Sequence, residues 1–124
     1  MSDVLDIADR FFAAIEAGDI ASVREIYAPD AAIWHNTDGL VQGPDDNART
    51  LNWMTANLRD VSYTKIKRSA TADGFVQQHV LVATNRAGNP VEVPACIVTT
   101  ISDGRITRLD EYLDSASVAV IMER

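Results

Sequence analysis

The chain has 124 residues, of which 47% are hydrophobic and 23% are charged, and its formal net charge is −7. This composition is typical of a soluble globular protein, and a single domain over residues 1–124 accounts for the whole length. The negative charge repels phosphates and anionic lipids, and there is no apolar run of about 18 residues, so we expect neither nucleic acid nor a membrane as a partner.

The N-terminal segment is predicted to be helical. It lacks the basic region and apolar core of a secretion signal, so we expect a cytoplasmic protein. Ser2 or Asp3 can cap a first helix, because the apolar residues from Val4 to Ile15 recur with a period of about 3.6 residues. Asp19 can cap a second, shorter helix that ends at Ala28-Pro29-Asp30, since the residue before a proline disfavours helix.

A short strand and a third helix follow. Residues 31–36, Ala-Ala-Ile-Trp-His-Asn, are typical of a strand with His35 at its end, and the turn-forming residues 37–39 close it. Gly43-Pro44-Asp45 predicts the start of a helix that runs to about Leu58. Proline is tolerated in the first helical turn, and an acid there favours the positive end of the helix dipole.

The second half of the chain consists of predicted strands. Residues 61–72 and 75–86 flank Asp73-Gly74, and residues 91–114 extend on both sides of Asp103-Gly104. Both dipeptides supply the positive φ angles of two-residue hairpin turns. Three helices with one early strand, followed by a meander of four strands, predict an α+β fold whose helices cover one face of a curved antiparallel sheet.

Neither face of the strand from Ala95 to Ile101 is strongly polar. Such a strand is normally covered on both sides, and we expect the rest of the domain on one side and a second subunit on the other. The resulting homodimer contact is predicted to include Ile97, Thr99, Ile101, Arg108 and Tyr112. Pro94 should mark a sheet edge or a bulge, and the tail over residues 115–124 should extend the sheet or dock on the partner.

Three segments of the chain resemble the NTF2-like superfamily. They are residues 11–19 (Phe-Phe-Ala-Ala-Ile-Glu-Ala-Gly-Asp), residues 27–31 (Tyr-Ala-Pro-Asp-Ala), and Asp-Gly-Arg-Ile at 103–106 with Glu-Tyr-Leu-Asp at 111–114. The resemblance is closer to the SnoaL-like and ketosteroid-isomerase-like branch. It implies a cone-shaped barrel, usually dimeric, of three N-terminal helices on a strongly curved, mostly antiparallel sheet, with a pocket for a small, often hydrophobic molecule. The superfamily includes isomerases, cyclases, dehydratases, epoxide hydrolases and proteins without catalysis, so no single chemistry is implied.

The catalytic positions of these relatives are partly kept. Ketosteroid isomerases have a general-base aspartate at the end of the first strand, where this chain has His35. Their two oxyanion-binding residues fall at Phe11 and Cys96, so both donors are missing or weakened. Epoxide hydrolases and polyketide cyclases of the superfamily carry an acid on the last long strand, which Glu111 matches, but their arginine and aspartate pair has no clear match.

His35 and Glu111 are the predicted catalytic residues. A histidine with a pKa near about 6.5 can take a proton from a carbon acid or an attacking water at neutral pH, although turn residues could also satisfy this one. Glu111 lies between Leu109 and Leu113, which suggests a lined cavity. From the wall opposite His35 it could orient the water or stabilise the imidazolium. If the strand alternation is shifted by one residue, Asp110 faces the cavity instead.

Further residues are candidates for ligand contacts. The wall positions implied by the resemblance are Phe11, Tyr27, Asn52, Trp53 and Cys96, the last an inert wall residue. His79 belongs either to the pocket or to the core, where Gln77 or the backbone would bond it. Hydrogen bonds to a developing oxygen charge would have to come from His79, Tyr27 or Asn52.

The two histidines and Glu111 raise the question of a metal site. No His-x-His or His-x-x-x-His spacing supports one, so we expect no metal and no other cofactor. Lys65, Lys67 and Arg68 form a basic run that we interpret as a solvated strand face. The leading hypothesis is an enzyme that moves a proton on an uncharged, partly apolar small molecule, and the alternative is a non-catalytic ligand-binding or dimerisation module.

Overall fold

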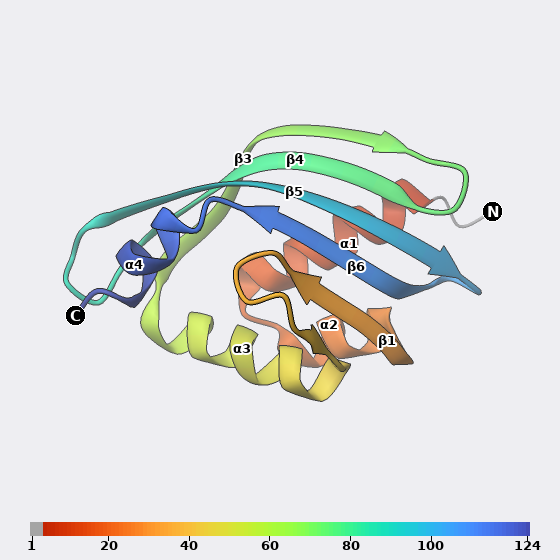
Figure 1. Ribbon diagram of the computed structural model, residues 1–124, viewed down its shortest axis with the longest axis horizontal. Helices are drawn as coiled ribbons and strands as arrows, with labels where there is room; N and C mark the ends of the chain where they lie inside the picture. Colours follow the sequence, from red (N-terminus) through yellow and green to blue (C-terminus); the bar gives the residue numbers. More distant parts are fainter. Residues whose placement is uncertain (1–3) are drawn as a thin grey trace.

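The structure is a computed structural model that describes residues 4–124, and Figure 1 shows its helices and strands. In chain order they are α1 (Val4–Ala17), α2 (Ile20–Ile26), β1 (Tyr27–His35), β2 (Val41–Gln42), α3 (Pro44–Asn57), β3 (Arg59–Ala70), β4 (Phe75–Thr84), β5 (Pro90–Ser102), β6 (Arg105–Leu113) and α4 (Ala116–Met122). The candidate caps Ser2 and Asp3 lie outside the described residues. Within residues 4–124, no helix combines the length and the apolar character needed to cross a bilayer.

The strands form one sheet in the order β2-β1-β6-β5-β4-β3. β1 and β6 are parallel, and the other neighbouring strands are antiparallel. The pairing of β3 with β4 shifts after Thr64, and that of β5 with β6 shifts after Thr100. Such bulges bend a sheet and increase its twist. The predicted α+β fold, with helices packed on a strongly curved and mostly antiparallel sheet, is confirmed (Figure 1).

The core lies between the first two helices and the sheet. The helical period of α1 places Ile7, Phe11 and Phe12 on one buried face, where they pack with Phe75 and Ile106 of the sheet. The predicted cap of α2 is confirmed, because a side-chain oxygen of Asp19 accepts a hydrogen bond from the backbone N–H of Ser22 at 3.2 Å. This packing fixes the helical hairpin against the sheet.

The second helix is shorter than expected and the first strand is longer. β1 begins at Tyr27 instead of Ala31, so Pro29 lies within the strand. A proline and the residue before it both favour extended backbone. Pairing of β1 with β6 is irregular between Tyr27 and Ala32, which accommodates the missing N–H group of Pro29.

The prediction for Pro94 is only partly right, and the tail does not extend the sheet. The β4–β5 ladder runs through Pro94 without a shift, and pairing of β5 with β6 begins at Ala95, so Pro94 has a partner strand on one side only. The bulge lies instead where the β5–β6 pairing shifts, after Thr100. Residues 116–122 form helix α4 and do not extend the sheet. Val118, Ile121 and Met122 of this helix line a cavity of the same chain, as described below.

The assignment of faces on β5 was shifted by one residue. Ile97 and Thr99 are buried inside the domain and Ile101 packs against its core, so none of these three lies on the outer face. The outer residues are Cys96, Val98 and Thr100, whose cross-strand partners on β6 are Tyr112, Asp110 and Arg108. A strand with two apolar faces gives no sequence signal for which face is inside.

Candidate functional site

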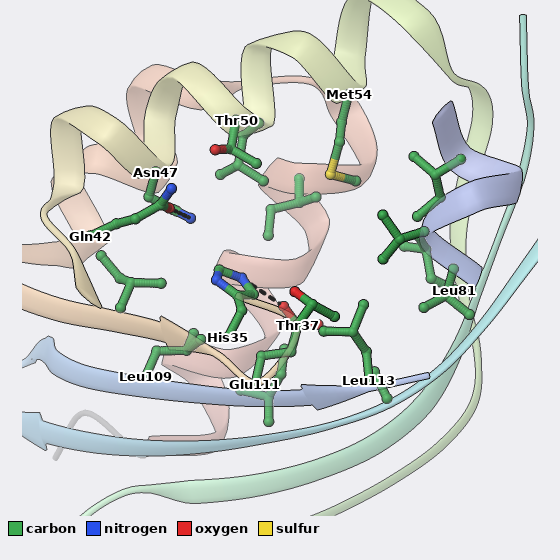
Figure 2. Close-up of a pocket in the computed structure, with 18 of the residues that line it drawn as sticks. His35, Thr37, Gln42, Asn47, Thr50, Met54, Leu81, Leu109, Glu111 and Leu113 are labelled. Atoms are coloured by element: carbon green, nitrogen blue, oxygen red, sulfur yellow. Dashed lines mark hydrogen bonds and ion pairs between the residues drawn. The ribbon is translucent and has the colours of Figure 1, made fainter. Parts of the chain in front are cut away.

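A cavity of about 270 Å³ lies between α3, the inner face of the sheet and α4. Figure 2 shows Asn47, Thr50 and Met54 of α3 on one side of it, facing His35, Leu109 and Glu111 from β1 and β6. Most of the lining is apolar, and none of the lining residues, all within 4–124, is a lysine or arginine. The lining residues predicted from sequence are Phe11, Tyr27, His35, Trp53, His79 and Glu111.

His35 and Glu111 meet directly inside this cavity. The two residues are cross-strand partners on the neighbouring parallel strands β1 and β6. His35 Nε2 and Glu111 Oε1 are 3.0 Å apart, and the side chains are 20% and 21% exposed (Figure 2). The expectation that they face each other from opposite walls was wrong. Of the two acids considered, Glu111 faces the cavity, while Asp110 pairs with Arg108 on the outer face.

Asn36, which the sequence reading did not single out, holds the two strands in this register. Its side-chain Oδ1 accepts a hydrogen bond from the N–H of Leu113 at 2.9 Å, and its Nδ2 donates to the carbonyl of Leu113 at 3.2 Å. Its own N–H donates to the carbonyl of Glu111 at 3.0 Å. These bonds join the end of β1 to the end of β6, which keeps His35 beside Glu111.

The surroundings of His35 raise the pKa of its imidazole above the ordinary value. Burial acts in the opposite direction, because it disfavours the charged ring. The hydrogen bond to Glu111 and the negative charges of Glu111 and Asp38 outweigh that effect. The imidazole of His35 therefore keeps its proton to a higher pH than a free histidine does.

His79, on β4, lines the same cavity and is also bonded to Gln77, so the two predicted alternatives are both correct. The distance from Gln77 Nε2 to His79 Nδ1 is 2.9 Å. Gln77 in turn accepts a hydrogen bond from Arg68 Nε at 2.7 Å, and Arg68 also pairs with Asp9. The interpretation of Arg68 as part of a solvated face was wrong, since its side chain is 17% exposed and lies over the ring of Phe12.

Two tyrosines add hydroxyl groups to the cavity wall. Tyr27 packs edge to face on Phe11 with ring centroids 5.6 Å apart, and Tyr63 packs on His79 at 4.7 Å. Burial raises the pKa of both phenols, and the negative charge of Glu111 raises it further. Both hydroxyls therefore stay protonated at neutral pH and can donate hydrogen bonds.

Two predicted wall residues lie outside this cavity. Asn52 is on the exposed side of α3, and it is not among the cavity's lining residues. Cys96 points to the outer face of the sheet, where it borders a separate shallow groove with Tyr112. For Cys96 the cause is the same shift by one residue along β5.

Helix α4 closes one end of the cavity with Val118, Ile121 and Met122. The fully buried Asn85 holds this helix by donating to the carbonyl of Val120 at 2.8 Å and to Glu123 Oε1 at 3.0 Å. Asn85 directly follows β4, although the strand was predicted over residues 75–86, and sequence alone gave no signal for its partner. Among the described residues, no group of three or more His, Cys, Asp or Glu side chains is arranged to hold a metal ion.

Comparisons with known proteins agree with this architecture. Residues 8–109 match the family model described as a SnoaL-like domain. An uncharacterized protein of Mycobacterium tuberculosis strain H37Rv is 32% identical over 126 residues, with 91% of each chain covered.

Solved structures share the fold at lower identity. A hypothetical protein of Catenulispora acidiphila with a ketosteroid isomerase-like fold, in complex with trimethylamine, has a TM-score of 0.80 at 18% identity and covers 92% of this chain and 89% of its own. A "putative polyketide cyclase" of Pseudomonas putida KT2440 has a TM-score of 0.85 at 19% identity, with 99% and 100% covered. The fold is that of ketosteroid-isomerase-like and SnoaL-like proteins.

Proposed function

The chain belongs to the SnoaL-like family of the NTF2-like superfamily, and we propose that it is a small-molecule enzyme in which His35 and Glu111 move a proton. The observation that carries this proposal is the 3.0 Å contact between His35 Nε2 and Glu111 Oε1 inside the cavity. An imidazole held by a carboxylate is a common arrangement for general acid–base catalysis.

The contact assigns different tasks to the two ring nitrogens. Nε2–H of neutral His35 donates to Glu111, which leaves the lone pair on Nδ1 as the base. Within residues 4–124, no protein group forms a hydrogen bond with Nδ1. When Nδ1 takes a proton from a carbon acid or a water, the ring becomes an imidazolium and Glu111 stabilises its charge. The same proton can then return to another atom of the product.

The lining limits the substrate class. A volume of about 270 Å³ suits a small molecule, and the mostly apolar wall favours an uncharged, partly apolar one. Glu111 and Asp38 both line the cavity without a lysine or arginine there, so anionic substrates are disfavoured. The Tyr27 hydroxyl can donate a hydrogen bond to an oxygen on which negative charge develops, which Phe11 cannot do.

A deuterium-exchange screen tests this proposal directly. Enolisable ketones, epoxides and polyketide-like ketones are incubated in D₂O with the wild type and with His35→Ala, and loss of C–H signal or substrate turnover is followed by NMR. We expect at least one carbon acid to react with the wild type and a fall of roughly 100-fold or more in His35→Ala. A substrate processed equally well by both proteins would show that His35 is not the base.

Binding without catalysis is the alternative function. It is favoured by the apolar or outward-facing residues at the two oxyanion positions, Phe11 and Cys96. A ligand that binds the cavity, leaves unchanged and exchanges no proton would support this alternative.

We also propose a homodimer that covers the outer face of the sheet. Tyr112 is 51% and Val98 is 38% exposed there, and Trp34 packs on Tyr112 with ring centroids 5.2 Å apart. A twofold contact is the commonest way to cover such a patch. Light scattering of the wild type should give a dimer, Val98→Glu should give a monomer, and the control Asn52→Glu, on the exposed side of α3, should stay dimeric. A wild type that is monomeric at micromolar concentration would contradict this proposal.

A further inference from the structure

A row of side chains connects the protein surface to the cavity through His79. It begins at Asp9 on α1, whose carboxylate pairs with Arg68 of β3. Arg68 Nε donates to Gln77 Oε1 at 2.7 Å, and Gln77 Nε2 lies 2.9 Å from His79 Nδ1. Gln77 is 0% exposed and His79 is 4% exposed, so water does not compete for these bonds. The mechanism proposed above uses none of the first three groups.

The chemistry of each group fixes the direction of these hydrogen bonds. A guanidinium can only donate, so the Gln77 atom that faces Arg68 must be the carbonyl oxygen. The amide nitrogen of Gln77 then faces His79, and it too can only donate. His79 Nδ1 must therefore accept, and the proton of the neutral ring must be on Nε2. Turning the Gln77 amide over would place donor against donor at Arg68 and would set its carbonyl oxygen against the Nδ1 lone pair of His79.

The ring of His79 has one orientation. Phe12 and Tyr63 pack against it edge to face, with centroids 5.7 Å and 4.7 Å away. Nε2 is the nitrogen left over, and within residues 4–124 no protein group forms a hydrogen bond with it. Nε2 is nevertheless not a fully buried atom, so it is open to the space beside it. The Nε2–H group thus remains for something that enters the cavity.

The charge state of His79 agrees with this geometry. Burial lowers the pKa of the imidazole and the positive charge of Arg68 lowers it further, although the negative charge of Glu111 acts in the opposite direction. Protonation at Nδ1 would also set two donors against each other at Gln77. The His79 ring is therefore held neutral, whereas the carboxylate beside His35 favours the protonated ring.

We propose that Arg68 and Gln77 are positioning residues that fix His79 as a neutral Nε2–H donor for a ligand oxygen, such as a carbonyl or enolate oxygen. His79 lies on β4 and Glu111 on β6, two strands whose backbones are roughly 10 Å apart, so a ligand between the two side chains lies across β5. That His79 also stabilises negative charge during the reaction rests on the proposed function. The fixed tautomer and the oxygen site do not depend on it.

Nitrogen NMR of the two histidines tests the fixed tautomer. In the ¹⁵N-labelled wild type at neutral pH, we expect His79 Nε2 to carry the proton and Nδ1 to have the shift of an unprotonated nitrogen. In Gln77→Glu a carboxylate replaces the donating amide, so Nδ1 should become protonated. The control Gln78→Glu changes the next residue of β4, which points outward and is exposed, and should leave His79 unchanged.

The wild-type spectrum alone can overturn the proposal, whether or not Gln77→Glu folds. A proton on Nδ1, or an imidazolium at neutral pH, would contradict it. Arg68→Met is a second variant, in which the Gln77 amide is free to turn and both tautomers should appear. If both variants fold and His79 still has its proton only on Nε2, then Arg68 and Gln77 do not set the tautomer.

A matched pair of probes tests the oxygen site. Cyclohexanone and methylenecyclohexane have nearly the same shape, but only the ketone accepts a hydrogen bond. We expect cyclohexanone to shift the His79 Nε2 signal and to bind the wild type roughly fivefold more tightly, a preference that His79→Phe, which removes the donor, loses. Equal binding of both, or no binding of either, would refute the oxygen site. His35→Gln should retain the preference, so failure of the proposed chemistry can be told apart from failure of this proposal.

Discussion

The two histidines of the chain line one cavity, yet their neighbours give them opposite properties. His35 contacts a carboxylate, Glu111, and its pKa is raised. His79 contacts an amide, Gln77, which is fixed by Arg68, and its pKa is lowered. Both rings are largely buried, so burial alone does not decide the outcome.

The difference shows that the partner of an imidazole determines its function. A carboxylate can accept a hydrogen bond from either the neutral or the protonated ring, so His35 can gain and lose a proton in place. An amide that donates its N–H to Nδ1 excludes the protonated ring, so His79 keeps its proton on Nε2. The cavity therefore combines His35, which can gain and lose a proton, with His79, which keeps its proton on Nε2.

The largest effect is expected on the proton-transfer rate when the carboxylate of Glu111, the partner of His35, is removed. Glu111→Gln should lower the proton-transfer rate on a substrate found in the screen by roughly 100-fold or more, because the imidazolium loses its counter-charge. The control Asp110→Asn alters the next residue of β6, whose side chain faces outward, and should keep the rate. A rate that falls in Asp110→Asn and not in Glu111→Gln would reverse the assignment of the acid.

A smaller effect, on the stability of the fold, is expected when Gln77, the residue between Arg68 and His79, is replaced. Gln77→Leu leaves buried donors and acceptors of Arg68 and His79 without partners, which should lower the free energy of unfolding by about 2 kcal/mol. Gln78→Leu, on the exposed side of the same strand, should change it by less than about 0.5 kcal/mol. Urea denaturation measures both values. Equal effects of the two substitutions would show that the Arg68–Gln77–His79 bonds do not stabilise the fold.

The pH dependence of stability should have opposite signs at the two histidines. The raised pKa of His35 means that its bound proton stabilises the fold fully below the unfolded pKa, and that this stabilisation is lost as the pH rises through the folded pKa. The lowered pKa of His79 means that its contribution is complete above the unfolded pKa and is lost as the pH falls through the folded pKa.

Matched substitutions make these signs measurable. His35→Gln should destabilise the protein more at about pH 5.5 than at about pH 8.5, and His79→Gln should do the reverse. Unfolding free energies of each variant and the wild type at both pH values give the two differences. The same pH trend for both variants would refute the contrast between the histidines.

Local patterns in the sequence were sufficient for most of the fold. Helical periodicity and the Asp-Gly turns predicted the first three helices and the long strands, and residue type, strand position and the family resemblance together selected His35 and Glu111 as the candidate catalytic residues. The direct contact between them was missed, because nothing in a single sequence shows that β1 and β6 are parallel neighbours.

Other misses came from features that local patterns cannot resolve. A strand with two apolar faces does not reveal which face is inside, and this placed Cys96 in the cavity. Gln77 was expected as a partner of His79, but Arg68 looks like an ordinary surface residue, and its bond to Gln77 depends on a contact between two strands. The apolar residues of the tail fit a strand or a helix equally well, so α4 and its role in closing the cavity were not predicted.

The most direct test of the account is an NMR pH titration of His35 in the wild type and in Glu111→Gln. The chain has two histidines, so each ring can be followed separately. We expect His35 to titrate above about 6.5 in the wild type and below about 6.5 in Glu111→Gln, because burial remains after the carboxylate is gone. A pKa of His35 that stays the same in both proteins would show that Glu111 does not control its proton.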